Sequence, residues 1–195
     1  AFYITEDHKK ELVEIAAWWK GKVLYDKGRA LMSQELRDLQ DSAIIKATGN
    51  LTSGDAHIAV DFFKILSVGL NGYLKEIKQY HQRIKRYEQE GLRKDNFYSA
   101  LTISIRAFQE FIRRYQQLAN SMSTKEVNWE RQNELLAISR NCEVIADHAP
   151  ENFYQALQLV YFVQLVLQIE SNGHSVSLGR MDQYLYPFYI HDLRK

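Results

Sequence analysis

Residues 170–189 directly follow a run with few polar residues and contain many side chains that could bind or react with a ligand. They supply a carboxylate, an amide, an imidazole, hydroxyls, a guanidinium and several aromatic rings. Polar groups at the end of a buried element are costly unless they are paired or used. We therefore expect a functional site in this segment.

Within it, His174 and Ser175 directly follow Asn172-Gly173, a dipeptide typical of a turn. On a turn, neighbouring side chains can face one cavity, whereas on a strand they point to opposite faces. An imidazole changes protonation near neutral pH, so it suits general acid–base catalysis. The alternative is a histidine that caps an element by hydrogen bonding to the backbone, and the residues alone leave both open.

A second candidate is His57, at the end of a loop over residues 46–57 that is rich in Gly, Ser, Thr and Asn. We expect Asp55 to cap the following helix and His57 to lie in its first turn, where the helix dipole disfavours the imidazolium. A neutral imidazole there could accept a proton. The alternative is an ordinary cap beside a surface histidine.

The composition excludes several classes of function. The 195 residues carry 25 basic and 24 acidic side chains, without the basic excess that nucleic-acid binders show. No apolar run is long enough to span a membrane. The single cysteine, Cys142, rules out an internal disulfide and suggests a reducing, cytoplasmic setting. The other histidines lack metal-ligand spacing, so we expect no metal site.

The periodicity predicts a mainly α chain with one short strand near the C-terminus, at 175–178. A long amphipathic helix is expected after residue 57, running to a polar turn at 91–96, with a return helix over about 97–119. Two such helices joined by a short turn form an antiparallel hairpin. A helix over 150–168 is apolar nearly all round, so it should be central to the core.

Three segments of the sequence resemble the glycyl radical enzymes, the pyruvate formate-lyase-like family. Residues 169–187, IESNGHSVSLGRMDQYLYP, carry the most specific motif. Residues 48–62, TGNLTSGDAHIAVDF, and residues 153–158, FYQALQ, are similar to two further family segments. The resemblance covers nearly the whole chain in order.

The resemblance implies that residues 1–195 are a partial domain of this family, the helical N-terminal portion of a larger α/β barrel, reaching its first strand. In such enzymes, an activase that uses S-adenosylmethionine and an iron–sulfur cluster installs a glycyl radical, which passes to a cysteine thiyl. The sequence contains no Arg-Val-x-Gly-Tyr-type radical segment, and Cys142 does not match the thiyl cysteine. We therefore expect no catalytic residue and no bound cofactor in this chain. The resemblance also implies a homodimeric parent enzyme.

The amino-acid sequences of the two histidine motifs are most similar to those of the diol-dehydratase branch, represented by coenzyme B12-independent glycerol dehydratase. The resemblance implies that His57, His174 and Ser175 bind substrate hydroxyls. Ala56 replaces a glycine common in that motif, which would narrow the pocket beside His57. The alternatives are formate C-acetyltransferase activity, whose carboxylate substrates call for arginine clamps, and a chain that by itself is a non-catalytic helical scaffold or binding module.

Overall fold

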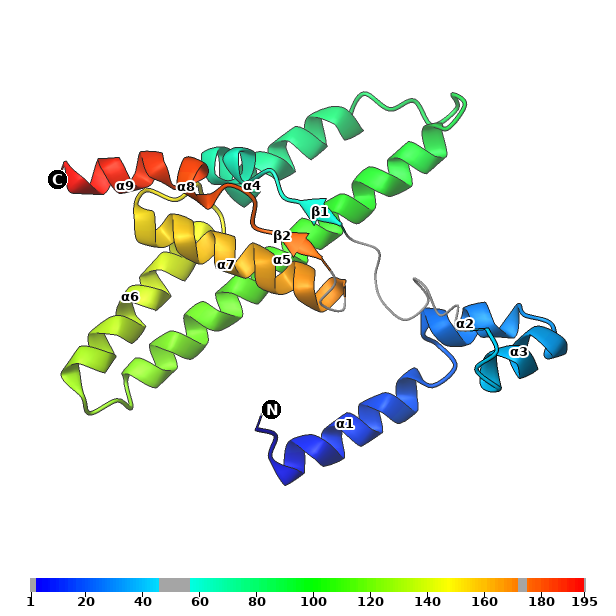
Figure 1. Ribbon diagram of the computed structural model, residues 1–195. Coiled ribbons are helices and arrows are strands. Elements are labelled where there is room, and N and C mark those ends of the chain that lie inside the picture. Colours follow the sequence, from blue (N-terminus) through cyan, green and yellow to red (C-terminus); the bar gives the residue numbers. More distant parts are fainter. Residues whose placement is uncertain (1–2, 46–56, 172–174, 195) are drawn as a thin grey trace. The chain divides into compact units, whose positions relative to one another are not determined.

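A computed structural model of the protein describes residues 3–45, 57–171 and 175–194. The chain divides into two compact units, residues 1–56 with 170–174 and residues 57–169 with 175–195. Helices dominate both units (Figure 1). None of the helices in the described ranges combines the length and the apolar character needed to cross a bilayer.

Over its described residues, the first unit contains three helices, α1 (Glu6–Trp19), α2 (Leu24–Ala30) and α3 (Gln34–Asp41). Thr5 caps α1, because its hydroxyl accepts a hydrogen bond from the backbone N–H of His8 at 3.2 Å. The apolar stripe of α1 is left exposed, however, and no residue of this helix is buried.

The second unit contains the remaining helices and both described strands, which Figure 1 labels. They are β1 (Ile58–Ala59), α4 (Phe62–His81), α5 (Gly91–Ser123), α6 (Trp129–Ile145), α7 (Phe153–Glu170), β2 (Val176–Ser177), α8 (Met181–Tyr184) and α9 (Tyr186–Leu193).

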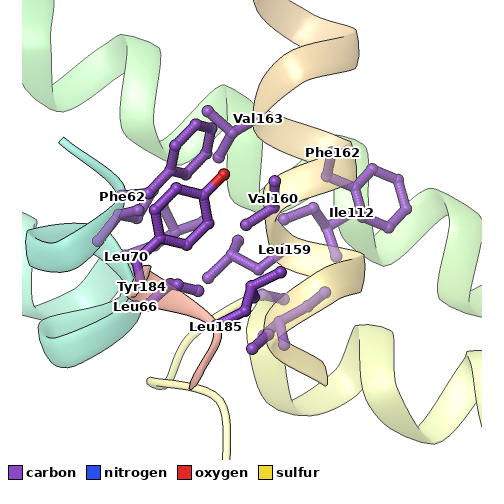
Figure 2. Packing of buried hydrophobic residues seen from close by; sticks show 14 of the residues in the cluster. Phe62, Leu66, Leu70, Ile112, Leu159, Val160, Phe162, Val163, Tyr184 and Leu185 are labelled. Atoms are coloured by element: carbon purple, nitrogen blue, oxygen red, sulfur yellow. The ribbon is translucent and has the colours of Figure 1, made fainter. Parts of the chain in front are cut away.

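The core of this unit surrounds α7, as its apolar sequence predicts. Leu159 and Val160 are fully buried and lie in one cluster with Phe62 and Leu70 of α4 and Ile112 of α5 (Figure 2). Burying a large apolar side chain stabilises a fold by roughly 1.5–3 kcal/mol. This cluster therefore fixes α7 and α4, the two helices that flank the strands in the sequence.

Helix α4 bends at Gly69, whose φ of 64° and ψ of −179° are open to glycine almost alone. At this point the helix meets the segment after α6: a Cβ on Gly69 would lie 2.4 Å from the backbone nitrogen of Ala149. The backbone N–H of Asn71 donates to the carbonyl of Asp147 at 3.0 Å. The carboxylate of Asp147 in turn accepts from Arg113 of α5 at 2.7 Å, which ties α5 to the same point.

The junction between α4 and α5 differs from the predicted continuous helix and turn at 91–96. Helix α4 ends at His81 and α5 already begins at Gly91. The physical reason lies in Asp95, whose two carboxylate oxygens lie 2.7 Å from Nε2 of His81 and 2.8 Å from Nη2 of Arg86. This pairing fixes the chain between the helices, and the left-handed backbone of Glu90 (φ 64°) starts α5.

The two strands form a parallel pair in which Ile58 lies opposite Val176 and Ala59 opposite Ser177. The predicted strand near the C-terminus is confirmed at β2. Strand β1 was not predicted, because two residues between a polar loop and a helix are too few to show the alternation of apolar and polar residues that marks a strand.

Candidate substrate site

Two of the three residues singled out from the sequence lie together in the structure. His57 and Ser175 each directly precede a strand, and the strands pair from the very next residues, Ile58 and Val176. The Ile58 N–H donates to the Ser175 carbonyl oxygen at 3.3 Å. The parallel register therefore places the two motifs side by side, although they are far apart in the sequence.

A hollow of about 480 Å³ lies over this strand pair and is lined by residues of both strands. The lining consists of His57, Ile58, Ala59, Ser175, Val176 and Ser177. Of these residues only Val176 is buried. An exposed imidazole and an exposed hydroxyl thus border one hollow, which is the arrangement that hydrogen bonding to a small polar ligand requires.

His57 does not lie in the first turn of a helix, so that part of the prediction is wrong. It precedes β1, and α4 begins five residues later, where the Asp61 carboxylate caps it by accepting from the Lys64 N–H at 3.0 Å. The helix dipole therefore does not act on the His57 imidazole as expected. Asp55 and Ala56 lie outside the described residues.

Ser175 holds a strained backbone, with φ of 47°. For a residue other than glycine, the left-handed region costs about 1–2 kcal/mol. Such strain persists where the surrounding structure over-determines the conformation, and it clusters at functional sites. His174, the third predicted site residue, lies outside the described residues, and so do Asn172 and Gly173.

Side chains of two helices hold β2 and the residue after it. The Gln164 Nε2 amide of α7 donates to the Val176 carbonyl at 3.0 Å, and the Tyr184 hydroxyl of α8 donates to the Leu178 carbonyl at 2.8 Å. The Tyr184 ring packs 4.9 Å from that of Phe62, and burial raises its pKa. Its hydroxyl therefore stays protonated and remains a donor.

These supporting residues were missed as site residues in the sequence. A signal for Gln164 was present, since a glutamine in a mostly apolar helix calls for a partner, but Gln155, Gln158 and Gln168 of the same helix carry the same signal. Tyr184 gave none, because it stands among several other aromatic residues in its segment.

In the part of the chain that the structure describes, the site has no metal-binding character. No group of three or more His, Cys, Asp or Glu side chains comes close enough there to hold an ion. The His57 imidazole and the Ser175 hydroxyl are groups that can form hydrogen bonds and transfer protons.

Cys142 belongs to the core and not to this site. Its side chain is fully buried in α6, and burial raises the pKa of its thiol to about 11. A protonated, enclosed thiol behaves as a small apolar side chain, as its position in a helix predicts.

Comparison with known proteins assigns the family. A family model described as pyruvate formate lyase-like matches residues 1–195. The chain belongs to this family. Its relatives include a probable dehydratase of Escherichia coli K12, YbiW, which is 46% identical over 98% of this chain and 24% of its own length.

Solved structures of the pyruvate formate lyase-like family agree with the fold. The glycerol-bound B12-independent glycerol dehydratase of Clostridium butyricum matches with a TM-score of 0.83 and 30% identity, over 97% of this chain and 24% of that one. A structure from Roseburia inulinivorans, described as one of 1,2-propanediol dehydration, matches with a TM-score of 0.85 and 34% identity, over 99% and 24%. The chain thus spans about a quarter of the length of the relatives it matches.

The recognition of a glycyl radical enzyme from three sequence motifs is therefore confirmed. Membership of this family implies a glycyl radical as the source of reactivity. These relatives are dehydratases, which favours the dehydratase interpretation over formate C-acetyltransferase.

Proposed function

We propose that the parent enzyme catalyses the radical dehydration of a small diol or polyol such as glycerol, and that this chain supplies part of its substrate site. One observation carries the proposal: the parallel register brings His57 and Ser175 to neighbouring strand starts. His174 adjoins Ser175 in sequence and completes the proposed set. The dehydratases among the relatives support the substrate class.

The residue types suit this reaction. Dehydration of a diol removes one hydroxyl as water and leaves a carbonyl compound, so an acid must protonate the departing oxygen and a polar group must hold the remaining one. Imidazoles of His57 and His174 can donate or accept protons near neutral pH, and the Ser175 hydroxyl can do both. The radical supplies hydrogen abstraction from the substrate carbon, a step to which no residue of this chain is assigned.

We further assign residues 1–195 to the helical N-terminal portion of a larger α/β barrel, with α4 and α5 as its antiparallel hairpin and the parallel pair of β1 and β2 as the start of its sheet. The bond of Gln109 in α5 to Asn71 in α4, at 2.9 Å, supports the pairing of these helices. The proposal includes an activase that uses S-adenosylmethionine and an iron–sulfur cluster, a homodimeric parent and a cytoplasmic location. The chain by itself would then be a scaffold without turnover.

The test uses the full-length parent enzyme, activated anaerobically with its activase, with the glycyl radical quantified by electron paramagnetic resonance. We expect aldehyde formation from glycerol or 1,2-propanediol. His57→Ala and His174→Ala should abolish it at unchanged radical content, whereas His8→Ala, at an exposed position on α1, should not. Acetyl transfer from pyruvate to coenzyme A without diol dehydration would overturn the proposal, and so would full turnover by both site variants.

A further inference from the structure

The backbone carbonyl groups of Ser175 and Val176 accept hydrogen bonds from different elements of the fold. The Ser175 carbonyl accepts from Ile58 of β1. The Val176 carbonyl accepts instead from the Gln164 side chain of α7, with 3.0 Å between nitrogen and oxygen. Two successive carbonyls at the start of β2 are therefore held by hydrogen bonds, one from the neighbouring strand and one from the core helix.

Gln164 lies in a mostly apolar helix that also contains Gln155, Gln158 and Gln168. Its Oε1 atom is buried and has no hydrogen-bond partner among the described residues. A half-satisfied amide in such a place costs about 1–3 kcal/mol compared with an apolar side chain. Packing alone does not explain this residue, and within the described part of the chain its one hydrogen bond goes to Val176.

That bond lies directly beside the strained residue of the site. Ser175 has φ of 47°, and a conformation of this kind needs neighbours that hold it. The bonds from Ile58 and Gln164 fix the peptide groups on both sides of Val176 and so restrain the backbone that carries the Ser175 hydroxyl.

We infer that Gln164 is a positioning residue: through the Val176 carbonyl its amide holds the Ser175 hydroxyl where it binds substrate. This inference rests on the proposed function, which makes Ser175 a substrate contact. The role requires a donor of this length. Methionine has the same length without a donor, and an ionised glutamate only accepts.

A matched control lies on the same helix. Gln158 is also partly buried, but its amide donates to the Cys142 sulfur at 3.0 Å, away from β2. Gln158→Met therefore makes the same chemical change as Gln164→Met without touching the strand. We expect both variants to reach the same glycyl radical content in the full-length enzyme. Gln158→Met should lose more thermal stability than Gln164→Met, because the Gln158 side chain also accepts a hydrogen bond from Asn141 at 3.3 Å.

The function-specific readout is a double-mutant cycle on glycerol binding to the unactivated full-length enzyme, measured by NMR titration so that inactive variants can be included. Gln164→Met should weaken glycerol binding about tenfold where Ser175 is present. In a Ser175→Ala background Gln164→Met should change glycerol binding less than about twofold. The reason is that the effects of two substitutions are not additive when one residue acts through the other. An equal loss in both backgrounds, or a loss no greater than that of Gln158→Met, would overturn the inference.

A second measurement separates this inference from the proposed function. Hydrogen exchange of the peptide spanning 57–61, read by mass spectrometry, should be faster in Gln164→Met than in Gln158→Met, because the Ile58 amide bonds to Ser175. Unchanged exchange would refute the link between Gln164 and the strand pair while leaving diol turnover intact. A wild-type enzyme that neither binds nor dehydrates a diol would instead refute the proposed function.

Discussion

The backbone amide of Ile58 donates a hydrogen bond to the carbonyl oxygen of Ser175, with 3.3 Å between the two atoms. This bond joins two segments that are distant in the sequence. It places the residue before Ile58, which is His57, beside the start of β2. A substrate bound there would meet an imidazole from one segment and a hydroxyl from the other.

Two substitutions of Ser175 should distinguish the role of its hydroxyl from the role of its strained backbone conformation. Ser175→Ala keeps a Cβ at φ of 47°, whereas Ser175→Gly relieves that strain. Both remove the hydroxyl, so we expect both to lower kcat/KM for glycerol about tenfold, the effect of losing one hydrogen bond to the substrate. Steady-state kinetics of the activated parent enzyme, at equal radical content, provide the test. Wild-type turnover in Ser175→Gly would show that the hydroxyl is not used.

Gly69 should be the most sensitive backbone position in the bend of α4. Alanine there would place its Cβ 2.4 Å from the backbone of both His148 and Ala149, in a φ region that resists side chains. Strain and overpacking together should cost about 4 kcal/mol. Gly179→Ala is the control, because Gly179 has the same φ of 64° with nothing within 4 Å, and it should cost about 1 kcal/mol.

Urea unfolding followed by circular dichroism measures both free energies. If the two alanine variants lose the same stability, the close approach between α4 and the segment after α6 is not needed for folding.

Much of this arrangement could be predicted from local patterns. The apolar character of 150–168 identified the central helix, and the period-two pattern at 175–178 identified β2, because burial imposes both patterns on the sequence. The two site motifs were found from residue types that are costly unless used, namely histidine and serine beside turn residues. Their pairing could not be found this way, since parallel pairing depends on a contact between distant segments.

The errors have specific physical causes. The helix expected to continue to a turn at 91–96 ends at His81, because Asp95 binds His81 and Arg86 and fixes the chain between the two helices. His57 was placed in a helix because Asp55 is a good cap, but Asp61 caps α4 instead. The contacts of Asp95 at the first place, and the pairing of β1 with β2 beside His57 at the second, outweigh a local preference that is worth about 1 kcal/mol.

The Asp95 carboxylate should make the junction of α4 and α5 sensitive to acid. The bond with His81, and then that with Arg86, holds the pKa of Asp95 below its ordinary value. A lowered folded-state pKa adds stability above the ordinary pKa of aspartate, and this stability is lost as pH falls through the lower value. Asp95→Asn should therefore reduce stability at neutral pH, and its difference from the wild type should vanish in acid.

Urea unfolding from about pH 6 down to about pH 2.5 covers that window. Asp7→Asn is the control, because the Asp7 side chain is 93% exposed and lies 3.5 Å from its lysine partner. Parallel pH profiles of the wild type and Asp95→Asn would contradict the assignment.

The Cys142 thiol should resist modification until the chain unfolds. Burial raises its pKa to about 11, and the smaller opposing effect is the hydrogen bond from Gln158. Because the thiolate is the reactive form, an enclosed thiol with this pKa reacts slowly at pH 8. Labelling with a thiol reagent should yield one modified group per chain in urea and almost none in the folded protein. The control is Ser121→Cys, at an exposed position of α5, which should be labelled at once under native conditions. Equally fast labelling of Cys142 would show that α6 opens far more readily than its buried contacts with α7 allow.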